Sequence, residues 1–255
     1  MPMTTEHGRS HRGGENERRL CRSNLDRVRA EVAEACRRAG RDPAGVRIVG
    51  VTKYVPLGFA AMLVEAGCFD LGESRPQSLW ERAEALPAAR WHLIGRLQRN
   101  KVRRTLPLVS LVHSLDSRRL LDAIATEAGA AGSICDALVE VNLDGDPARG
   151  GLAAEEVPGL LDVAARSPAV RIRGLMGMAS APGPGTPADG PRRQFALLRR
   201  LRDNLAADHP GCIELSMGMS GDFVDAVLEG STMIRIGSAL WEGMAAADAS
   251  ATPGG

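Results

Sequence analysis

Apolar residues follow two different periods along this chain, and the longest helical pattern comes first. Between Glu15 and Arg38, apolar side chains recur at spacings of four, three, four and four, which places them on one face of a helix. These positions are Cys21, Leu25, Val28, Val32 and Cys36. Gly40 follows in the usual place for a glycine that ends a helix. The pattern predicts an N-terminal helix over residues 15–38.

After this helix, short apolar runs rich in β-branched residues alternate with amphipathic segments. The runs that predict strands are VRIVGVTK (46–53), FDLGES (69–74), WHLIGRL (91–97), LVHSLD (111–116), ALVEVNL (137–143), RIRGLMGMAS (171–180), IELSMGMS (213–220) and MIRIGSAL (233–240). Segments of helical period lie between them, for example at 117–129, 154–166 and 194–208. Buried strands that alternate with helices indicate an α/β fold with a parallel sheet. Because eight strands close a barrel, we expect a single (β/α)8 barrel of the TIM type, with the N-terminal helix as an addition.

An open, doubly wound parallel sheet is the alternative architecture. It is less favoured because no GxGxxG follows the first strand and no GxxxxGK[ST] occurs anywhere. We therefore expect one barrel domain over residues 15–245, with disordered tails at 1–14 and 246–255. The connection APGPGTPADGP (181–191) is too rich in proline and glycine for a helix. It is interpreted as a flexible surface loop, with a lid over the barrel as the alternative.

Composition and charge argue against several classes of protein. A formal net charge of +1 gives no strong field to attract nucleic acid. The N-terminal stretch MPMTTEHGRSHRGGE has no apolar core for a signal peptide, and nowhere do 18 apolar residues run together, so no membrane segment is expected. The five cysteines are scattered without a CxxC pair, so we expect neither a disulfide framework nor a metal site. A reducing, cytoplasmic location fits best.

Lysine is the informative residue type in this composition. The 32 basic residues include only two lysines, Lys53 and Lys101. Lys53 ends the first predicted strand, and in a parallel barrel functional groups gather at the C-terminal ends of the strands. An amine differs from a guanidinium because, once deprotonated, it is a nucleophile that condenses with an aldehyde, and burial favours that form. A lone lysine at a strand end is more often simply solvated, so this position by itself leaves both interpretations open.

Two turns near other strand ends have the composition of a phosphate site. One contains Ser220, and the other contains Gly237 and Ser238. Such turns offer backbone N–H groups and hydroxyl groups to a phosphate. An aldehyde together with a phosphate describes pyridoxal 5′-phosphate, and the strand residue Arg235 suits the ring nitrogen of that cofactor.

Other polar residues have simpler interpretations. Ser216 and Ser220 do not lie in GxSxG and have no evident base, so roles in a turn or in phosphate binding are favoured over that of a nucleophile. His92 and His113 lie within predicted strands and are interpreted as interior or rim residues. The arginine-rich run RLQRNKVRR has no interleaved aromatic residues, which indicates a solvated helix start with an anion site rather than an RNA-binding surface.

A set of motifs resembles one protein family. VGVTKYVP, LGES, WHLIGRLQRNK, HSLD, GLMGMAS, LSMGMSGD and GSTMIRIG occur in this order. Together they resemble the pyridoxal phosphate homeostasis protein family (YggS/PROSC-type) over residues 15–243. That family is similar to the N-terminal barrel of alanine racemases, the fold-type III arrangement. The resemblance implies that Lys53 carries pyridoxal phosphate as an aldimine and that Arg235 faces the pyridine nitrogen.

The same resemblance implies the full set of cofactor-binding residues. They are Lys53, Ser74, Met176, Ser216, Met217, Ser220, Arg235, Gly237 and Ser238. The phosphate is assigned to Gly237 and Ser238 together with either Ser216 or Ser220. The two methionines lie in the GLMGM and SMGM motifs, and their side chains also suit packing in the barrel.

The chain departs from the family pattern at three positions. Ser74 stands where asparagine is usual, Ser78 where glutamate is common, and Arg149 where lysine is frequent. The change at Ser74 removes an amide that could contact the cofactor ring. The other two changes are expected to affect surface or secondary binding features.

The sequence is compatible with three functions from different classes. The resemblance implies a monomeric intracellular protein that serves pyridoxal phosphate homeostasis with little or no turnover and contacts apo-enzymes transiently. The alternative is a racemase-like enzyme, which needs a base on each face of the substrate, whereas the single tyrosine, Tyr54, adjoins Lys53 itself. The Arg235 guanidinium also disfavours a protonated ring nitrogen and so weakens the ring as an electron sink. An RNA-binding module that uses the arginine-rich run is the third and weakest hypothesis.

Overall fold

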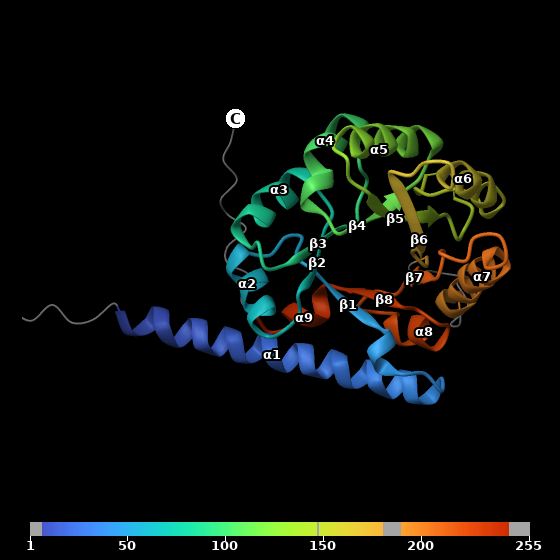
Figure 1. Cartoon of the computed structure of the whole chain (residues 1–255). Coiled ribbons are helices and arrows are strands. Elements are labelled where there is room, and N and C mark those ends of the chain that lie inside the picture. Colours follow the sequence, from blue (N-terminus) through green and yellow to red (C-terminus); the bar gives the residue numbers. More distant parts are fainter. Residues whose placement is uncertain (1–6, 147, 181–189, 245–255) are drawn as a thin grey trace, which may run out of the picture.

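The computed structural model describes residues 7–146, 148–180 and 190–244, and its centre is a closed barrel of eight parallel strands (Figure 1). The strands are β1 (Arg47–Val51), β2 (Asp70–Glu73), β3 (Arg90–Leu93), β4 (Leu111–Leu115), β5 (Cys135–Val141), β6 (Val170–Gly177), β7 (Glu214–Ser216) and β8 (Met233–Ile236). Each strand pairs with its neighbours in sequence, and β8 pairs with β1 to close the ring. The predicted (β/α)8 barrel is confirmed, and the open-sheet alternative is wrong.

Helices surround the barrel on the outside (Figure 1). In the described residues they are α1 (His7–Arg38), α2 (Leu57–Glu65), α3 (Pro76–Ala85), α4 (Val102–Thr105), α5 (Arg118–Ala130), α6 (Val157–Ala164), α7 (Gly190–Leu205), α8 (Phe223–Leu228) and α9 (Ser238–Trp241). Short 3-10 turns lie at Pro43–Gly45, Arg99–Lys101, Leu106–Leu108 and Ala154–Glu156. Parallel neighbours require a crossover connection, and a helix after each strand provides it.

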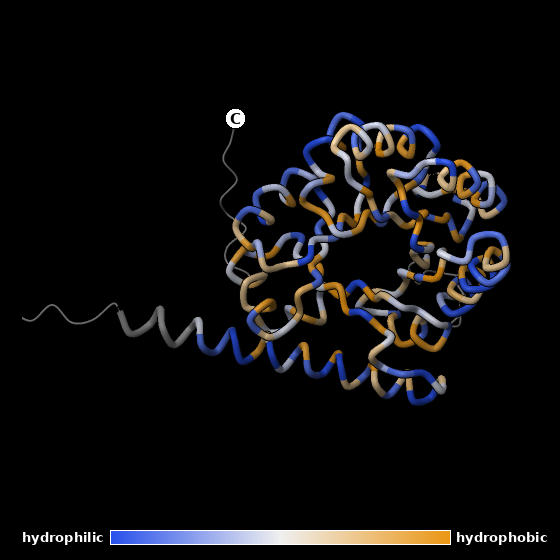
Figure 2. Tube along the Cα trace, in the orientation of Figure 1, coloured by the Kyte–Doolittle hydropathy of each residue, from blue (hydrophilic) through white to orange (hydrophobic). Residues whose placement is uncertain are grey.

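The main hydrophobic core lies between the barrel and its ring of helices. Leu63 of α2, Leu79 of α3 and Ile124 of α5 are fully buried against the strands. Figure 2 shows apolar segments along the strands and polar segments on the outer turns of the helices. A second, smaller apolar cluster fills part of the barrel interior. Its buried members are Leu111, Leu138, Met176 and Met233.

The N-terminal helix α1 lies along the outside of the barrel, where the strands β1 and β8 meet (Figure 1). Its predicted apolar face is confirmed, since Cys21, Leu25 and Val28 are fully buried. Asn24 ties the helix to the end of α9 by donating from Nδ2 to the Leu240 carbonyl at 3.1 Å. Helix α9 has only four residues, so α1 covers the wall of the barrel that a longer eighth helix would otherwise cover.

The ends of the elements differ from the sequence prediction. Helix α1 begins at His7 and not at Glu15. Strand β1 ends at Val51, so Lys53 lies in the turn beyond the strand and not at its last residue. Apolar runs continue past the last sheet hydrogen bond, because residues at the barrel mouth also pack against the following helices. The side-chain pattern therefore overestimates strand length.

Parts of the predicted tails and loop lie outside the described residues. These are residues 1–6, the tail at 246–255, and most of the 181–191 connection. Gly190 and Pro191, which the prediction placed in that loop, form the first turn of α7. Proline is tolerated there because the first N–H groups of a helix have no intrahelical partner. The loop prediction was wrong for these two residues.

The described residues also bear on membranes, metals and cysteine chemistry. Within them, no helix has both the length and the hydrophobicity needed to cross a membrane. The same residues contain no group of three or more His, Cys, Asp or Glu side chains arranged to hold a metal ion.

All five cysteines are buried thiols. Burial raises the pKa of Cys68 and of Cys135 to about 12, so both stay protonated at neutral pH.

Candidate functional site

The turn after β1 presents Lys53 at the mouth of the barrel, where the strands end. The Val55 N–H donates to the Thr52 carbonyl at 3.3 Å, and Tyr54 adopts a left-handed φ of 65°. Lys53 is exposed, and its Nζ lies 5.9 Å from the centroid of the Tyr54 ring. Within the described residues this ring is the sole partner of the amine. Lys53 is thus accessible to a ligand, and the expectation that it is buried at the mouth was wrong, because the turn beyond β1 carries it out into solvent.

A buried ion pair supports this turn from the barrel side. Glu73, the last residue of β2, pairs with Arg82 of α3 at 3.3 Å and accepts a hydrogen bond from Thr52 Oγ1 at 3.3 Å. Arg82 also donates to the Val55 carbonyl at 2.6 Å. The pair therefore holds the residues on both sides of Lys53. Sequence analysis did not single out this pair, and the only available signal was the position of Glu73 at a strand end.

Arg235 of β8 lies buried just below the mouth, with its guanidinium fixed by the ends of two strands. Its Nη1 donates to the Ser216 carbonyl at 2.8 Å and to Ser216 Oγ at 2.6 Å, and its Nη2 donates to the Gly177 carbonyl at 3.1 Å. Burial lowers the pKa of Arg235 to about 10, against the opposing charges of Asp222 and Glu140. The side chain is therefore a cation at neutral pH. Three of the five N–H groups of a guanidinium are used in these bonds, which leaves two for a ligand.

Ser220 lies beside the predicted phosphate turn at the start of α9. Its Oγ accepts hydrogen bonds from the N–H groups of Gly237 at 3.1 Å and Ala239 at 3.3 Å. Ser238, the first residue of α9, stands between these two N–H groups. Two backbone donors that converge on one oxygen can also bind an anionic oxygen. Ser216 bonds the guanidinium instead, so the structure groups Ser220, and not Ser216, with Gly237.

Ser74 follows the end of β2 and is half-buried at the same mouth. Its N–H donates to Glu73 Oε1 at 2.8 Å. A Cβ added at Gly95 would lie 2.4 Å from the Ser74 carbonyl oxygen, so only glycine permits this approach of the two segments. Contact between Ser74 and a cofactor ring stays a prediction.

Met176 and Met217 are fully packed in hydrophobic clusters. Met176 belongs to the cluster inside the barrel, and Met217 to the core between the barrel and the helices. The Met217 N–H donates to the Met233 carbonyl at 3.1 Å, and its carbonyl accepts from Ser231 Oγ at 2.8 Å. Both residues fill the structure around the mouth, and a cofactor contact for either stays a prediction.

His92 and His113 are buried inside the barrel, so they are interior residues and not rim residues. His92 Nδ1 and His113 Nε2 lie 2.9 Å apart although the residues are separated by 21 positions. His113 Nδ1 lies 2.9 Å from Ser216 Oγ, and Ser216 in turn bonds Arg235. No sequence motif shows that these side chains meet, because each comes from a different strand.

Glu140 of β5 is a further acidic group close to Arg235 that sequence analysis did not single out. Burial raises the pKa of the Glu140 carboxyl, and the charge of Asp116 adds to this effect. The positive charges of Arg235, Arg149 and Arg96 oppose it. The mouth therefore holds charges of both signs around the guanidinium.

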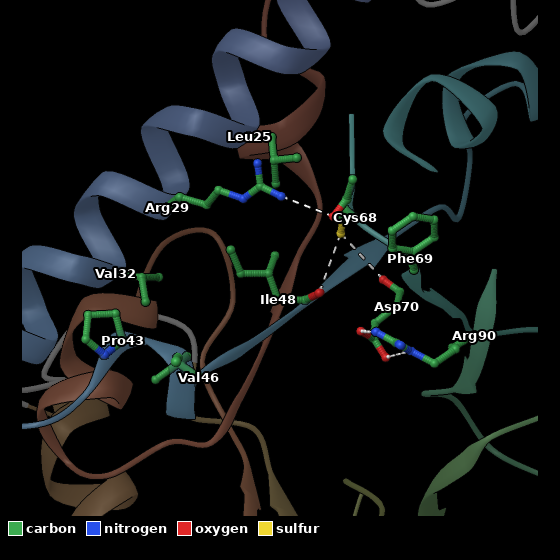
Figure 3. A pocket seen from close by; sticks show the side chains of 12 residues that line it. Leu25, Arg29, Val32, Pro43, Val46, Ile48, Cys68, Phe69, Asp70 and Arg90 are labelled. Atoms are coloured by element: carbon green, nitrogen blue, oxygen red, sulfur yellow. Dashed lines mark hydrogen bonds and ion pairs between the residues drawn. The ribbon is translucent and has the colours of Figure 1, made fainter. Parts of the chain in front are cut away.

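Two further cavities lie outside this cluster. A cavity of about 880 Å³ is lined by the arginine-rich run and the start of α5, with Arg96, Arg99 and Arg119 in its wall. Another, of about 360 Å³, lies between α1 and the beginnings of β1 and β2 (Figure 3). Because it opens at the beginnings of the strands, the second cavity belongs to the end of the barrel opposite Lys53.

Known proteins share this fold and these motifs. Residues 23–244 match the alanine racemase N-terminal domain. A pyridoxal phosphate homeostasis protein of Aquifex aeolicus is 38% identical over 220 residues, which cover 85% of this chain and 95% of that protein. The structure of PipY from Synechococcus elongatus PCC7942 with pyridoxal phosphate bound is 31% identical with a TM-score of 0.75, covering 86% of this chain and 99% of PipY.

An alanine racemase of Clostridium difficile 630 shares the fold at a TM-score of 0.70 and 15% identity, covering 87% of this chain and 56% of the racemase. The resemblance carried by the sequence motifs is confirmed by the matches over most of the chain. This chain therefore belongs to the pyridoxal phosphate homeostasis protein family, whose barrel is that of the alanine racemase N-terminal domain.

Proposed function

We propose that this chain binds pyridoxal 5′-phosphate covalently at Lys53 and serves to hold and supply this cofactor. Strand β1 pairs with β8, with Gly50 opposite Ile236, which brings Lys53 and Gly237 to neighbouring points of the mouth. The observation that carries the proposal is this convergence of an accessible amine, a fixed guanidinium and a pair of backbone donors. The pyridoxal phosphate bound in PipY, a relative at 31% identity, supports it.

Each group has a distinct role in this proposal. The neutral amine of Lys53 adds to the aldehyde carbon, and water leaves as the carbon–nitrogen double bond forms. The two unused N–H groups of Arg235 face the ring nitrogen. The N–H groups at Gly237 and Ala239, with the hydroxyl of Ser220, take the phosphate.

The same residues support a role with little or no turnover. A guanidinium stays protonated, so a ring nitrogen that faces Arg235 stays unprotonated and withdraws less charge from a substrate carbanion. Racemisation also needs a second base on the opposite face of the substrate. The single tyrosine, Tyr54, adjoins Lys53 and is 80% exposed. Both features favour a carrier over a racemase.

Delivery follows from the exposed position of the Lys53 turn. The turn stands at the open mouth, where a pyridoxal-phosphate-dependent apo-enzyme can approach it in a transient contact. We place this exchange in the cytoplasm and assign the carrier as a monomer.

The test uses the two lysines of the chain. Purified protein mixed with pyridoxal phosphate should show a visible absorption band from the covalent adduct. Lys53→Ala and Lys53→Arg should both lose this band, although the second variant keeps the positive charge. Lys101→Arg is the matched control and should keep the band, since Lys101 belongs to the 3-10 turn after β3.

Borohydride reduction followed by peptide mapping identifies the attachment site directly. The phosphopyridoxyl group is expected on the peptide that contains Lys53. Its presence on Lys101, or an unchanged band in Lys53→Arg, would contradict the assignment.

A further inference from the structure

Five buried side chains form a continuous hydrogen-bonded array through the barrel interior, and we call it the interior array. It begins at Asp70, the first residue of β2, whose Oδ1 lies 3.0 Å from His92 Nε2 of β3. His92 Nδ1 lies 2.9 Å from His113 Nε2 of β4, and His113 Nδ1 lies 2.9 Å from Ser216 Oγ of β7. The array ends at Arg235 of β8, which donates to Ser216 Oγ at 2.6 Å. It therefore links the beginning of one strand to the mouth of the barrel.

The two ends of the array, together with neutral imidazoles at His92 and His113, determine the direction of every hydrogen bond within it. An ionised carboxylate only accepts, so His92 Nε2 donates to Asp70, and a neutral His92 then accepts at Nδ1. His113 must donate from Nε2 and accept at Nδ1. The Ser216 hydroxyl must donate to His113, which turns its oxygen lone pairs toward Arg235. With both imidazoles neutral, this is the one order that satisfies all four contacts, because a guanidinium only donates.

The surroundings favour a neutral His113 and an ionised Asp70. Burial lowers the pKa of His113 well below its usual value, and the positive charges of Arg235 and Arg47 lower it further. Burial raises the pKa of Asp70, but hydrogen bonds from His92 and Arg90 outweigh this effect and lower it below its usual value. Figure 3 shows Asp70 with both carboxylate oxygens toward Arg90, which donates at 3.0 and 2.6 Å. The array therefore has an anionic end at Asp70 and a cationic end at Arg235, with His113 as a neutral imidazole between them.

We propose that the interior array positions Arg235 for the ring nitrogen of the cofactor, with His92, His113 and Ser216 as positioning residues. The inference rests on the proposed function, since it assigns the purpose of the array to that contact. Without His113 as acceptor, the Ser216 hydroxyl can rotate and present its hydrogen to the guanidinium. With His113 in place, the oxygen accepts from Nη1, and the plane of the guanidinium is set before the cofactor arrives. Asp70 thus acts on the mouth through two imidazoles without touching a ligand.

Nitrogen-15 NMR of protein labelled at histidine tests the order of the array without any cofactor. His92 and His113 should both be neutral Nε2–H tautomers at pH 7, with His92→Gln and His113→Gln used to assign the signals. An imidazolium, or an Nδ1–H tautomer at either residue, would overturn the inference. This result stands even if the chain fails to bind pyridoxal phosphate, so it separates the array from the proposed function.

Ligand affinity tests the link to the ring nitrogen. The two probes are pyridoxal 5′-phosphate and its 1-deaza analogue, in which a C–H group replaces that nitrogen. Ser216→Ala and His113→Leu should each lower the affinity for pyridoxal phosphate about tenfold, the usual scale for a lost hydrogen bond to a charged group. Each should change the affinity for the analogue by no more than about twofold. His113→Gln should restore most of the affinity, because an amide donates on one side and accepts on the other.

Ser114→Ala is the matched control for these variants. Ser114 is a buried serine of β4, next in sequence to His113, and its Oγ donates to the Gly95 carbonyl at 2.7 Å outside the array. This variant should bind both probes as the natural chain does. An equal loss of affinity for the two probes in Ser216→Ala, or no loss of affinity for pyridoxal phosphate, would show that the array only packs the core and does not position Arg235. Failure of the natural chain to bind either probe would instead overturn the proposed function.

Discussion

The proposed function gives two basic side chains, Lys53 and Arg235, different purposes within one mouth. The amine of Lys53 has the Tyr54 ring as its sole partner in the described residues and is free to react. The guanidinium of Arg235 is buried and bonded to neutral oxygens on β6 and β7. A nucleophile must keep its lone pair accessible, whereas a recognition group gains from being held in one geometry. If the proposed roles hold, exchanging the two residue types would remove both of them.

Ser220 allows the phosphate contact to be tested separately from the ring contact. Ser220→Ala should lower the affinity for pyridoxal phosphate roughly threefold to tenfold, because one neutral hydrogen bond is lost. Affinity for pyridoxal, which has no phosphate, should stay within about twofold. Ser231→Ala is the control, since that buried hydroxyl donates to the Leu215 and Met217 carbonyls and not to the phosphate turn. A similar loss for both ligands would argue against a phosphate role.

The Asp70–Arg90 pair predicts a pH-dependent contribution to stability. The folded pKa of Asp70 is depressed below the usual 3.8, so its contribution is present above that pH and is lost as the pH falls through the folded pKa. Asp70→Asn should therefore lower Tm at pH 7 by roughly 2–8 °C. The difference from the natural chain should narrow steadily below about pH 4. Calorimetry across this range checks the sign, and a difference that widens in acid would contradict it.

At the scale of elements, α1 is the unusual feature of this barrel. The ring of helices is incomplete where the chain enters β1 and leaves β8, because α9 has only four residues. Helix α1 fills this place with a continuous apolar face that includes Leu25 and Val28. Arg41, just beyond the helix, donates to the Val227 and Ser231 carbonyls at 2.8 Å and ties the same wall to the end of α8. The helix is thus part of the barrel's core and not an appendage.

Truncation of a buried residue of α1 should measure that role. Leu25→Ala should lower the free energy of unfolding by about 2–5 kcal/mol, the usual cost of a leucine-to-alanine change in a core. Arg22→Ala, on the exposed side of the same helix, should change it by less than about 0.5 kcal/mol. Chemical denaturation of both variants provides the measurement. Equal and small effects would show that α1 is dispensable for the folded barrel.

At the scale of the whole molecule, barrel closure makes one site from distant segments. Lys53 follows the first strand and Arg235 lies on the last, and the pairing of β1 with β8 brings these two strands side by side. The charges at the mouth are mixed, with Glu140 and Asp222 near the guanidinium. In the proposed function this arrangement binds the ring and the phosphate of the cofactor. It provides no dedicated base opposite Lys53 in the part of the chain that the structure describes.

The whole-molecule prediction concerns turnover. With pyridoxal phosphate bound, the chain should show a kcat below about 1 per second for racemisation or transamination of common amino acids. The physical reason is the proposed contact with Arg235, which would keep the ring nitrogen unprotonated, together with the lack of a second base opposite Lys53 in the described residues. Coupled assays with single amino acids provide the measurement. A kcat in the ordinary enzyme range would favour the racemase-like alternative.

The alternation of apolar runs was enough to predict eight strands, their order and the buried face of α1. This information is local, since strand and helix periods repeat within a few residues. The scarcity of lysine pointed to Lys53, and the family motifs pointed to the turn at Gly237. Strand ends were less predictable, because side-chain patterns do not record where the backbone leaves the sheet.

The contacts between strands could not be derived from the chain read in order. Three of these contacts depend on which side chains point inward and on the register between strands. They are the contact of Ser220 with Gly237, the support of the Lys53 turn by Glu73 and Arg82, and the contact between His92 and His113. A closed barrel sets that register only when all eight strands pair, so these contacts are properties of the complete ring. Local periods therefore determine the elements, whereas barrel closure determines which polar groups meet, because hydrogen bonds require atoms to come within about 3 Å of each other.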